Sequence, residues 1–330
     1  MSWRMPAEWA AHDRTLMAWP AREDMWHDLW DDAQVAYAEV ANAIAAFEPV
    51  TMVARPQDRR RARAACGEGV TVSELPIDDS WLRDAGPIFV LDGTGRRAGL
   101  DFGFNAWGEK FEPFADDAEV AARLLERLGE ERVDARDFIL EGGSIAVDGD
   151  GTLITTEQCL LHPKRNPSLS KDEIARRLQD ELGVHAVVWL GQGLVEDHDT
   201  DGHVDNICAP IAPGRVLLQT VAEESNPNWS YTRENAERLQ AAGLEVVELP
   251  LLPYVDHDGP PTVVPYTNFY ICNGALIVPV AGQETDEEAL ALLSGLYPGR
   301  EVVPIDGTTL ALGGGGIHCI TQQVPALPED

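Results

Sequence analysis

The stretch SKDEIARRLQDELGVHAVVWL, residues 170–190, contains the pattern that decides the fold of this chain. Ser170 begins an amphipathic helical pattern that continues to Leu182, and Gly183 follows it as a helix stop signal. The next run, 184–190, is short, apolar and rich in β-branched residues, which predicts a buried strand. The stretch therefore predicts a helix followed by a buried strand.

The same helix and strand pattern recurs along the chain. After each strand comes a polar or glycine-rich connecting segment, and then a sequence typical of a β-hairpin. The repeating unit is predicted to run in the order helix, strand, hairpin. Further helices are predicted at 59–65, 116–128, 231–242 and 285–296, and further strands at 70–72, 244–249 and 301–305. Hairpins are predicted to begin at 87–91, 144–147, 204–209 and 269–272.

Equivalent points of the repeat are separated by roughly 50 to 65 residues, a spacing that suits units each containing a helix. Any α/β chain alternates helices and strands, but here chemically active side chains recur just before the hairpin in four of five units. This placement predicts an α/β fold in which five units direct side chains toward a common axis. The equivalent points are Asp84, Glu141, His203, Asn268 and Ile317.

The charge and the cysteine content of the chain limit which binding partners and which compartment are expected. The chain has 330 residues and a formal net charge of −31, which disfavours nucleic acid and anionic membranes and favours cationic substrates, although acidic residues also simply solvate a surface. Five scattered cysteines without a CxxC pair argue against a disulfide framework and a zinc ribbon. No signal-peptide or membrane-spanning pattern is visible. We expect a cytoplasmic protein.

The motif WLRDAGP, residues 81–87, presents an aromatic ring, a cation and a carboxylate before a turn. An indole face can stack on a planar cation, and a carboxylate can bind a guanidinium through two parallel hydrogen bonds. The alternative is that Trp81 is a core residue and that Arg83 and Asp84 form a surface ion pair. Glu141, before two glycines, is likewise either a turn residue or a site residue.

The segment 199–206, DTDGHVDN, carries the candidate acid/base. In an extended strand His203 and Asp205 would project from the same face, so that the carboxylate keeps the imidazole protonated near neutrality. The acidic residues from Glu196 to Asp205 also allow a metal site, but neither HExxH nor the EF-hand spacing is present. A catalytic His/Asp pair is favoured over a bound metal.

Cys319 is the candidate nucleophile, because it follows four glycines, 313–316. Glycine backbone adopts conformations that other residues avoid and can approach a ligand closely, which would position the cysteine for attack. The other four cysteines are expected to be inert core residues. His318 is expected to point to the opposite strand face, which leaves His203 as the acid/base. The glycines are expected to leave room for a planar substrate beside the sulfur.

A cysteine and a histidine among carboxylates do not suit a peptidase, because the carboxylates would oppose the negative charge that develops on a peptide carbonyl. A guanidinium is positive, planar and rich in N–H donors, so the same carboxylates would bind it. Attack by cysteine, loss of ammonia and then attack by water would give a urea. The chemistry is therefore predicted to be deimination.

The chain resembles the agmatine deiminases of the pentein superfamily, whose fold is a pseudo-symmetric five-bladed α/β propeller. The resemblance runs along the whole chain, with Ala85 and Gly316 as departures where the family frequently has Thr and Asn. It rests on MPAEW (5–9), His12, Trp19-Pro20, WLRDAGP (81–87), FNAWG (104–108), EGGS (141–144), TDGHVDN (200–206) and residues 313–323.

The resemblance implies a role for each candidate residue. Cys319 would form an amidino-cysteine intermediate and His203 would be the general acid/base; Asp84 and Asp205 would hold the guanidinium. Glu141 would support the two aspartates, Trp81 would pack beside the guanidinium plane, and Gly316 belongs to the glycine approach. Asp199 and Glu196 would receive the distal amine.

The resemblance also implies one deiminase domain over residues 1–330, built from five ββαβ-like units, without metal or organic cofactor. The expected reaction converts agmatine and water to N-carbamoylputrescine and ammonia in putrescine biosynthesis, and a homodimer is expected. Deimination of peptidyl-arginine and non-catalytic polyamine binding remain the alternatives.

Overall fold

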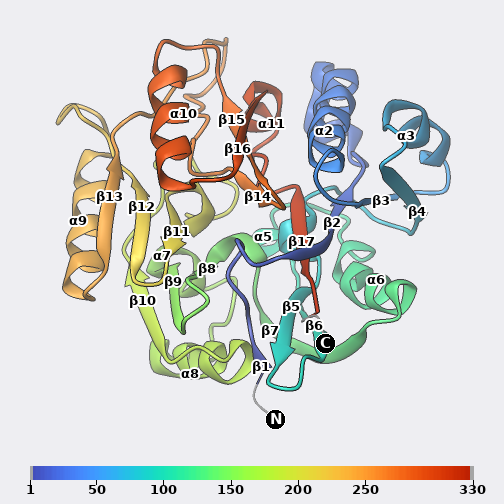
Figure 1. The fold of residues 1–330 in the computed structure, drawn as a ribbon, viewed down its shortest axis with the longest axis horizontal. Coiled ribbons are helices and arrows are strands. Elements are labelled where there is room, and N and C mark those ends of the chain that lie inside the picture. Colours follow the sequence, from blue (N-terminus) through green and yellow to red (C-terminus); the bar gives the residue numbers. More distant parts are fainter. Residues whose placement is uncertain (1–2, 328–330) are drawn as a thin grey trace.

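The computed structural model describes residues 3–327, and within this range the strands form five separate sheets. Figure 1 shows these sheets placed around the middle of the molecule, with long helices such as α8, α9 and α10 on the outside. The fold is therefore mixed α/β, with the ends of several sheets directed toward a shared centre.

Three sheets repeat one arrangement, in which an antiparallel hairpin is followed by a helix and by a third strand parallel to the second. A parallel pair needs a crossover connection, which the helix provides. The sheets are β8 (Ile145–Val147), β9 (Thr152–Thr156) and β10 (Ala186–Leu190); β11 (Cys208–Ala212), β12 (Arg215–Gln219) and β13 (Glu245–Leu249); and β14 (Tyr270–Cys272), β15 (Ala275–Val280) and β16 (Glu301–Asp306). Their helices are α7 (Glu157–Leu160) and α8 (Lys171–Leu182), α9 (Trp229–Ala241) and α10 (Thr285–Leu296).

The fourth sheet adds an edge strand from the N-terminal region to the same arrangement. It contains β1 (Trp3–Arg4), β5 (Ile88–Asp92), β6 (Arg97–Gly103) and β7 (Glu131–Ile139), with η2 (Asp117–Glu119) and α6 (Val120–Leu128) in the crossover.

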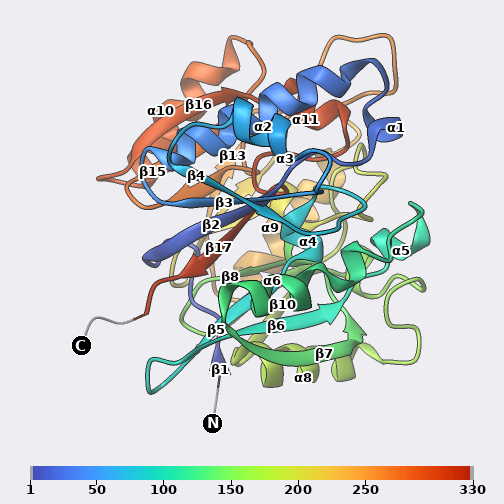
Figure 2. The same cartoon turned by 90° about the vertical axis from the view of Figure 1, so that its right-hand side faces the viewer.

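The fifth sheet joins the two ends of the chain, because β17 pairs antiparallel with β2 as the hairpin of this unit. Figure 2 shows β17 lying alongside β2 and β3. The elements are β17 (Thr321–Pro325), β2 (His12–Ala18), α1 (Glu23–Trp26), η1 (His27–Leu29), α2 (Trp30–Ala45), β3 (Val50–Ala54), α3 (Arg59–Ala65) and β4 (Val70–Glu74).

The helices predicted from sequence are confirmed to within a few residues. Ser170 forms a capping box with Glu173, and Gly129 and Gly183 end their helices in the left-handed region, where glycine is strain-free. The chain order helix, strand, hairpin is confirmed, and the structure adds that the strand after each helix pairs with the hairpin before it.

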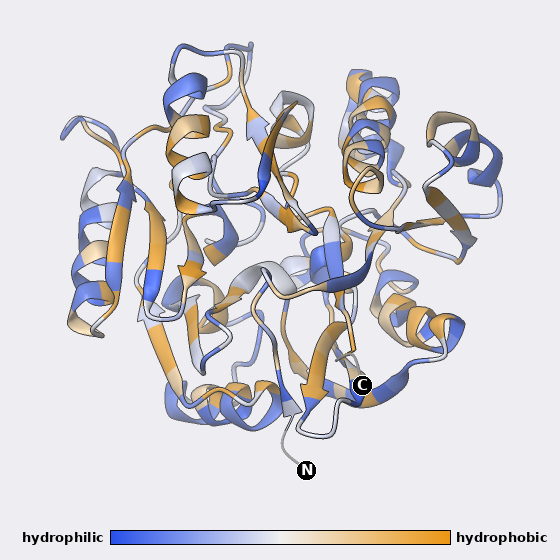
Figure 3. Cartoon of the chain, viewed as in Figure 1, coloured by the Kyte–Doolittle hydropathy of each residue, from blue (hydrophilic) through white to orange (hydrophobic). Residues whose placement is uncertain are grey.

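Helix α2 was not predicted, because its alanine-rich sequence buries residues around much of its circumference and gives no single apolar stripe. Figure 3 shows mostly hydrophobic inner strands and outer helices of mixed hydropathy, so the core lies between the sheets and their helices. No helix within residues 3–327 is long and apolar enough to cross a membrane.

Candidate active site

Cys319 lies in a turn at residues 317–320, between α11 (Thr308–Leu312) and β17. Its buried Sγ lies 3.3 Å from Asn268 Nδ2 and 3.5 Å from Asp205 Oδ2. Burial and the negative charges of Asp205 and Asp84 raise the pKa of this thiol well above its ordinary value. In the unliganded protein Cys319 is therefore a thiol, and a positive charge placed beside it would favour the thiolate.

Asp84 and Asp205 approach each other at one glycine. Asp84, on the short helix α4 (Leu82–Ala85), accepts hydrogen bonds from Gly143 N at 2.8 Å and Trp107 Nε1 at 2.9 Å. A Cβ on Gly143 would lie 2.9 Å from Asp84 Oδ1, 2.8 Å from Asp205 Oδ2 and 2.6 Å from His203 Nδ1. Three predicted site residues thus converge on a position where only glycine fits.

The prediction that His203 and Asp205 share one face of an extended strand is wrong. Residues Val204–Asn206 form the 3₁₀ helix η4 and not a strand, although both side chains still approach Gly143. His203 Nδ1 lies 3.8 Å from Asp84 Oδ1, whereas Asp205 Oδ2 pairs with His318 Nδ1 at 2.9 Å. The prediction that His318 points away is wrong for a related reason: it lies in a turn, not a strand, and its ring contacts Asp205.

The imidazole of His203 is buried, and neither ring nitrogen has a hydrogen-bond partner among residues 3–327. Buried polar atoms normally have partners, so an unsatisfied imidazole near the carboxylates of Asp84 and Glu141 is a mark of a functional site. The ring is therefore a candidate for proton exchange with a ligand.

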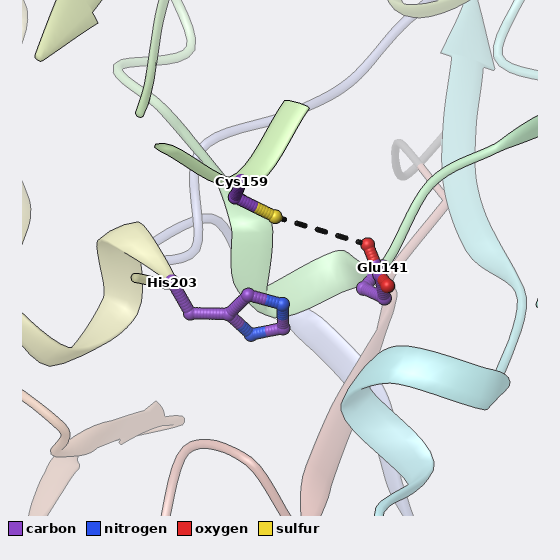
Figure 4. A group of neighbouring side chains, drawn as sticks. All are labelled: Glu141, Cys159 and His203. Atoms are coloured by element: carbon purple, nitrogen blue, oxygen red, sulfur yellow. Dashed lines mark hydrogen bonds between the residues drawn. The ribbon is translucent and has the colours of Figure 1, made fainter. Parts of the chain in front are cut away.

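Glu141 lies near His203 and is fully buried. Arg165 Nε contacts its carboxylate at 2.5 Å, and Cys159 Sγ, on α7, lies 4.0 Å from its other oxygen (Figure 4). Glu141, Cys159 and His203 hold three potential metal-ligand atoms within 4.8 Å of one another. Because Arg165 already places a cation against Glu141, the group favours support of His203 over binding of a metal ion.

A cavity of about 20 Å³ adjoins Cys319, and Trp81, Asp84 and Asp199 are among its lining residues. Trp81 stacks on Trp26 with ring centroids 5.8 Å apart, so one of its faces is fixed by the core. Burial and the charge of Asp197 raise the pKa of Asp199. The lining residues are Met25, Trp81, Asp84, Trp107, Phe111, Asp199, Thr200, Gly313, Gly314, Gly315 and Cys319.

A larger cavity of about 260 Å³ shares Asp199, Gly314 and Gly315 with the smaller one. Glu196 lines this larger cavity, where its carboxylate accepts hydrogen bonds from Tyr254 and Asn228. Glu196 therefore lies farther from the nucleophile than Asp199.

Gly313, Gly314 and Gly315 line the cavity at Cys319, as expected of residues that leave room beside the sulfur, and the glycine run also allows close packing. A Cβ on Gly315 would lie 2.4 Å from the Trp81 ring, and one on Gly314 2.5 Å from Asp199 Oδ2. Gly316 lines neither cavity; a Cβ there would lie 2.3 Å from Asn268 Oδ1. Larger residues would thus displace the side chains that surround Cys319.

Trp107 was not predicted to support Asp84. It lies on α5 (Ala106–Glu109), where Ala106, Trp107 and Glu109 have φ values of 52°, 54° and 64°. Left-handed backbone is strained in residues other than glycine and occurs preferentially at functional sites. The motif of aromatic and asparagine residues at 104–107 indicated a functional segment. The sequence could not show that Trp107 contacts Asp84, because the two residues belong to different elements.

Comparisons with known proteins agree with this geometry. Residues 4–325 match the family model for Porphyromonas-type peptidyl-arginine deiminase. An agmatine deiminase of Pseudomonas aeruginosa is 44% identical, with 98% of this chain and 95% of the relative covered. An agmatine deiminase of Stutzerimonas stutzeri is 43% identical over the same shares.

Two solved structures share the fold over nearly the whole chain. The agmatine deiminase of Enterococcus faecalis has a TM-score of 0.93 and 35% identity, covering 98% of this chain and 96% of the other. A cysteine-to-serine variant of C. jejuni agmatine deiminase with substrate bound has a TM-score of 0.92 and 28% identity, covering 99% and 97%. Together with the family model, these findings show that the chain belongs to the Porphyromonas-type peptidyl-arginine deiminase family.

Proposed function

We propose that this protein is an agmatine deiminase, which converts agmatine and water to N-carbamoylputrescine and ammonia in putrescine biosynthesis. The observation that carries the proposal is the Cys319 thiol, which lies beside the buried carboxylates Asp84 and Asp205. Two carboxylates and a thiol oppose a neutral electrophile and bind a guanidinium, whose positive charge offsets theirs.

In the first half-reaction, Asp84 and Asp205 hold the guanidinium nitrogens while Trp81 packs beside the guanidinium plane. The positive charge of the substrate favours the Cys319 thiolate, which attacks the central carbon and forms a C–S bond. One C–N bond then breaks, and His203 gives a proton to the departing nitrogen, which leaves as ammonia. An amidino-cysteine intermediate remains.

In the second half-reaction, His203 takes a proton from water, whose oxygen forms a C–O bond with the same carbon. The C–S bond breaks, and Cys319 is regenerated as the urea product leaves. Glu141 supports His203 from behind, with Arg165 balancing its charge. The proton that His203 gives to the departing nitrogen in the first half-reaction is replaced by the one that it takes from water in the second.

The distal amine of agmatine is assigned to Asp199, which lines both cavities, with Glu196 as a more distant charge. The glycine run, including Gly316, keeps Asn268 and Trp81 close to the sulfur. We extend the proposal to the architecture: residues 1–330 form one deiminase domain, and the five sheets are the blades of a pseudo-symmetric propeller.

Ammonia release from agmatine, free arginine and a peptidyl-arginine tests the function. We expect release from agmatine and its loss in Cys319→Ser. Cys66→Ser, a change at a cysteine at the end of α3, is the matched control and should retain activity. Turnover of peptidyl-arginine at the agmatine rate would favour the peptidyl alternative, and tight binding without ammonia would favour a polyamine-binding protein.

A further inference from the structure

His318 lies between two carboxylates that approach opposite nitrogens of its ring. Nδ1 is 2.9 Å from Asp205 Oδ2, and Nε2 is 2.9 Å and 3.1 Å from the two oxygens of Glu8. An ionised carboxylate only accepts hydrogen bonds, so both nitrogens must donate for both contacts to form. The geometry is that of an imidazolium ion.

Charges alternate along this line of side chains. Arg83 Nη1 lies 3.4 Å from Glu8 and donates to Gln323 at 2.8 Å, and its Nε donates to the carbonyl of His318 at 3.3 Å. Asp205, His318, Glu8 and Arg83 therefore form a row of negative, positive, negative and positive groups. Such a row stabilises each of its charges in a buried setting.

The directions of the pKa shifts agree with the geometry. Burial acts to raise the pKa of Glu8, but the charges of His318 and Arg83 lower it to about 2. Burial and Arg83 act to lower the pKa of His318, but Glu8 and the hydrogen bonds to Asp205 and Glu8 raise it above its ordinary value. Other titratable groups also face this row: Cys319 and Asp84 near Asp205, His12 and Tyr297 near Glu8, and Tyr270 near Arg83.

The position of His318 determines which oxygen of Asp205 is free. Oδ2 is engaged by His318 and faces the Cys319 sulfur, whereas Oδ1 is buried without a hydrogen-bond partner among the described residues. His318 does not line the cavity at Cys319; with Glu8 and Asp205 it lines a separate cavity of about 20 Å³. The ring therefore acts on the site only through Asp205.

We propose that His318, held in its charged form by Glu8, is a positioning residue that keeps Asp205 ionised and presents its Oδ1 to the guanidinium. The inference rests on the proposed function for its substrate and adds a residue pair to it. Asp205, one of the two carboxylates that bind the guanidinium, is therefore supported by a titratable group. The positive charge of His318 is present below the pKa of His318 and is lost as the pH rises through it.

The Glu8→Gln variant tests the inference through the pH profile of kcat/KM for agmatine. Removing the Glu8 charge, with Arg83 still beside the ring, makes it easier for His318 to lose its proton. We expect the alkaline limb to move to lower pH by about one unit or more. Glu237→Gln, at an exposed position of α9, removes the same charge elsewhere and should leave the profile unchanged.

A double variant separates positioning from general damage. In His318→Gln the imidazolium is absent, so adding Glu8→Gln should cause little further change in the profile. A full and additive effect of Glu8→Gln in that background overturns the inference, as does an unshifted alkaline limb in the single variant. If Glu8→Gln does not fold, Glu8→Asp should produce a smaller shift in the same direction, and an unshifted profile there overturns the inference.

Imidazole NMR of the unliganded protein gives a readout that does not need activity. The His318 signal, assigned through its absence in His318→Gln, should titrate at lower pH in Glu8→Gln than in the parent. Equal midpoints overturn the inference whether or not agmatine is turned over. Absence of ammonia release by the parent protein overturns the proposed function instead, so the two failures are distinguishable.

Discussion

Asp84 and Asp205 are both buried beside Cys319, but different kinds of donor hold them. Asp84 receives the indole N–H of Trp107 and the amide N–H of Gly143, which are neutral, whereas Asp205 receives the N–H of His318. Burial and the charges of Asp205 and Glu141 raise the pKa of Asp84, although His203 and Trp107 oppose this effect. The indole and amide donors stay neutral at any ordinary pH, whereas the positive charge of the His318 donor is lost as the pH rises through the pKa of His318.

The comparison shows how one site can combine a permanent and a titratable support. If both carboxylates had positively charged donors, the repulsion between Asp84 and Asp205 would be smaller. The donors would then also cancel the negative potential that attracts a cationic substrate. Two neutral supports would leave both carboxylates prone to protonation in a buried site. In the observed asymmetry, the charge of only one of the two supports, that of His318, is lost as the pH rises.

The Asp84→Asn variant removes the charge of the carboxylate that neutral donors hold, and we expect it to have the largest effect on activity. One charge–charge contact with the guanidinium is lost from a desolvated site, so we expect kcat/KM for agmatine to fall on the order of 1,000-fold. The Asp84 charge also contributes to the high pKa of the Cys319 thiol. Steady-state ammonia release measures the first effect.

The second effect of Asp84→Asn has the opposite sign. With one negative charge fewer, the thiolate of Cys319 forms at lower pH, so alkylation of the unliganded variant by iodoacetamide should begin at lower pH than in the parent. Asp180→Asn, at an exposed position of α8, is the charge-matched control. Equal alkylation profiles in Asp84→Asn and the parent would contradict the electrostatic account of the thiol.

The helices and the candidate site residues could be predicted from the sequence, because both depend on local sequence pattern. Helical periodicity and the capping glycines placed the helices. A polar residue before the hairpin identified Asp84, Glu141 and His203 as candidates, and Asp205 was identified by its spacing of two residues from His203. What supports these side chains could not be read, because it depends on contacts between distant segments. Glu8 and His318 are separated by 310 residues and meet only because β17 pairs with β2.

The two errors at the site have a common physical cause. His203–Asp205 and His318–Cys319 were both interpreted with the two-residue alternation of strands, but the first pair leads into a 3₁₀ helix and the second lies in a turn. Side-chain direction in such segments follows their hydrogen bonds and not a period. The residue types of the site were therefore predictable, whereas their pairing was not.

The Trp107→Phe variant weakens the neutral support without removing a charge. Phenylalanine keeps the ring that packs edge-on against Phe104 and Phe111, but it cannot donate to Asp84. A hydrogen bond to a charged group contributes roughly 1.5–3 kcal/mol, so we expect kcat/KM to fall at least about tenfold. The alkaline limb should not move, in contrast to Glu8→Gln; a shift of similar size would show that the two supports are not distinct.

The Asp117→Asn variant examines a buried carboxylate held by neutral donors that takes no part in the proposed chemistry, and its effect should be the smallest. Asp117 accepts hydrogen bonds from the amides of Asp78 and Asp79, and burial and the charge of Asp79 raise its pKa to about 7. Because the folded-state pKa exceeds the unfolded value, the folded protein binds more protons between about pH 4 and pH 7, and its stability falls as the pH rises through this window.

Asparagine keeps an oxygen acceptor for both amides but cannot ionise, so the variant should lack this fall in stability and should exceed the parent in stability at pH 8. Because a buried site can relax, we expect a gain on the order of 1 kcal/mol in the free energy of unfolding, measured by urea denaturation at pH 5 and pH 8. Asp180→Asn should show no such pH-dependent gain. An equal gain at pH 5 and pH 8 would contradict this account, because it could not come from the ionisation of Asp117 in the folded protein.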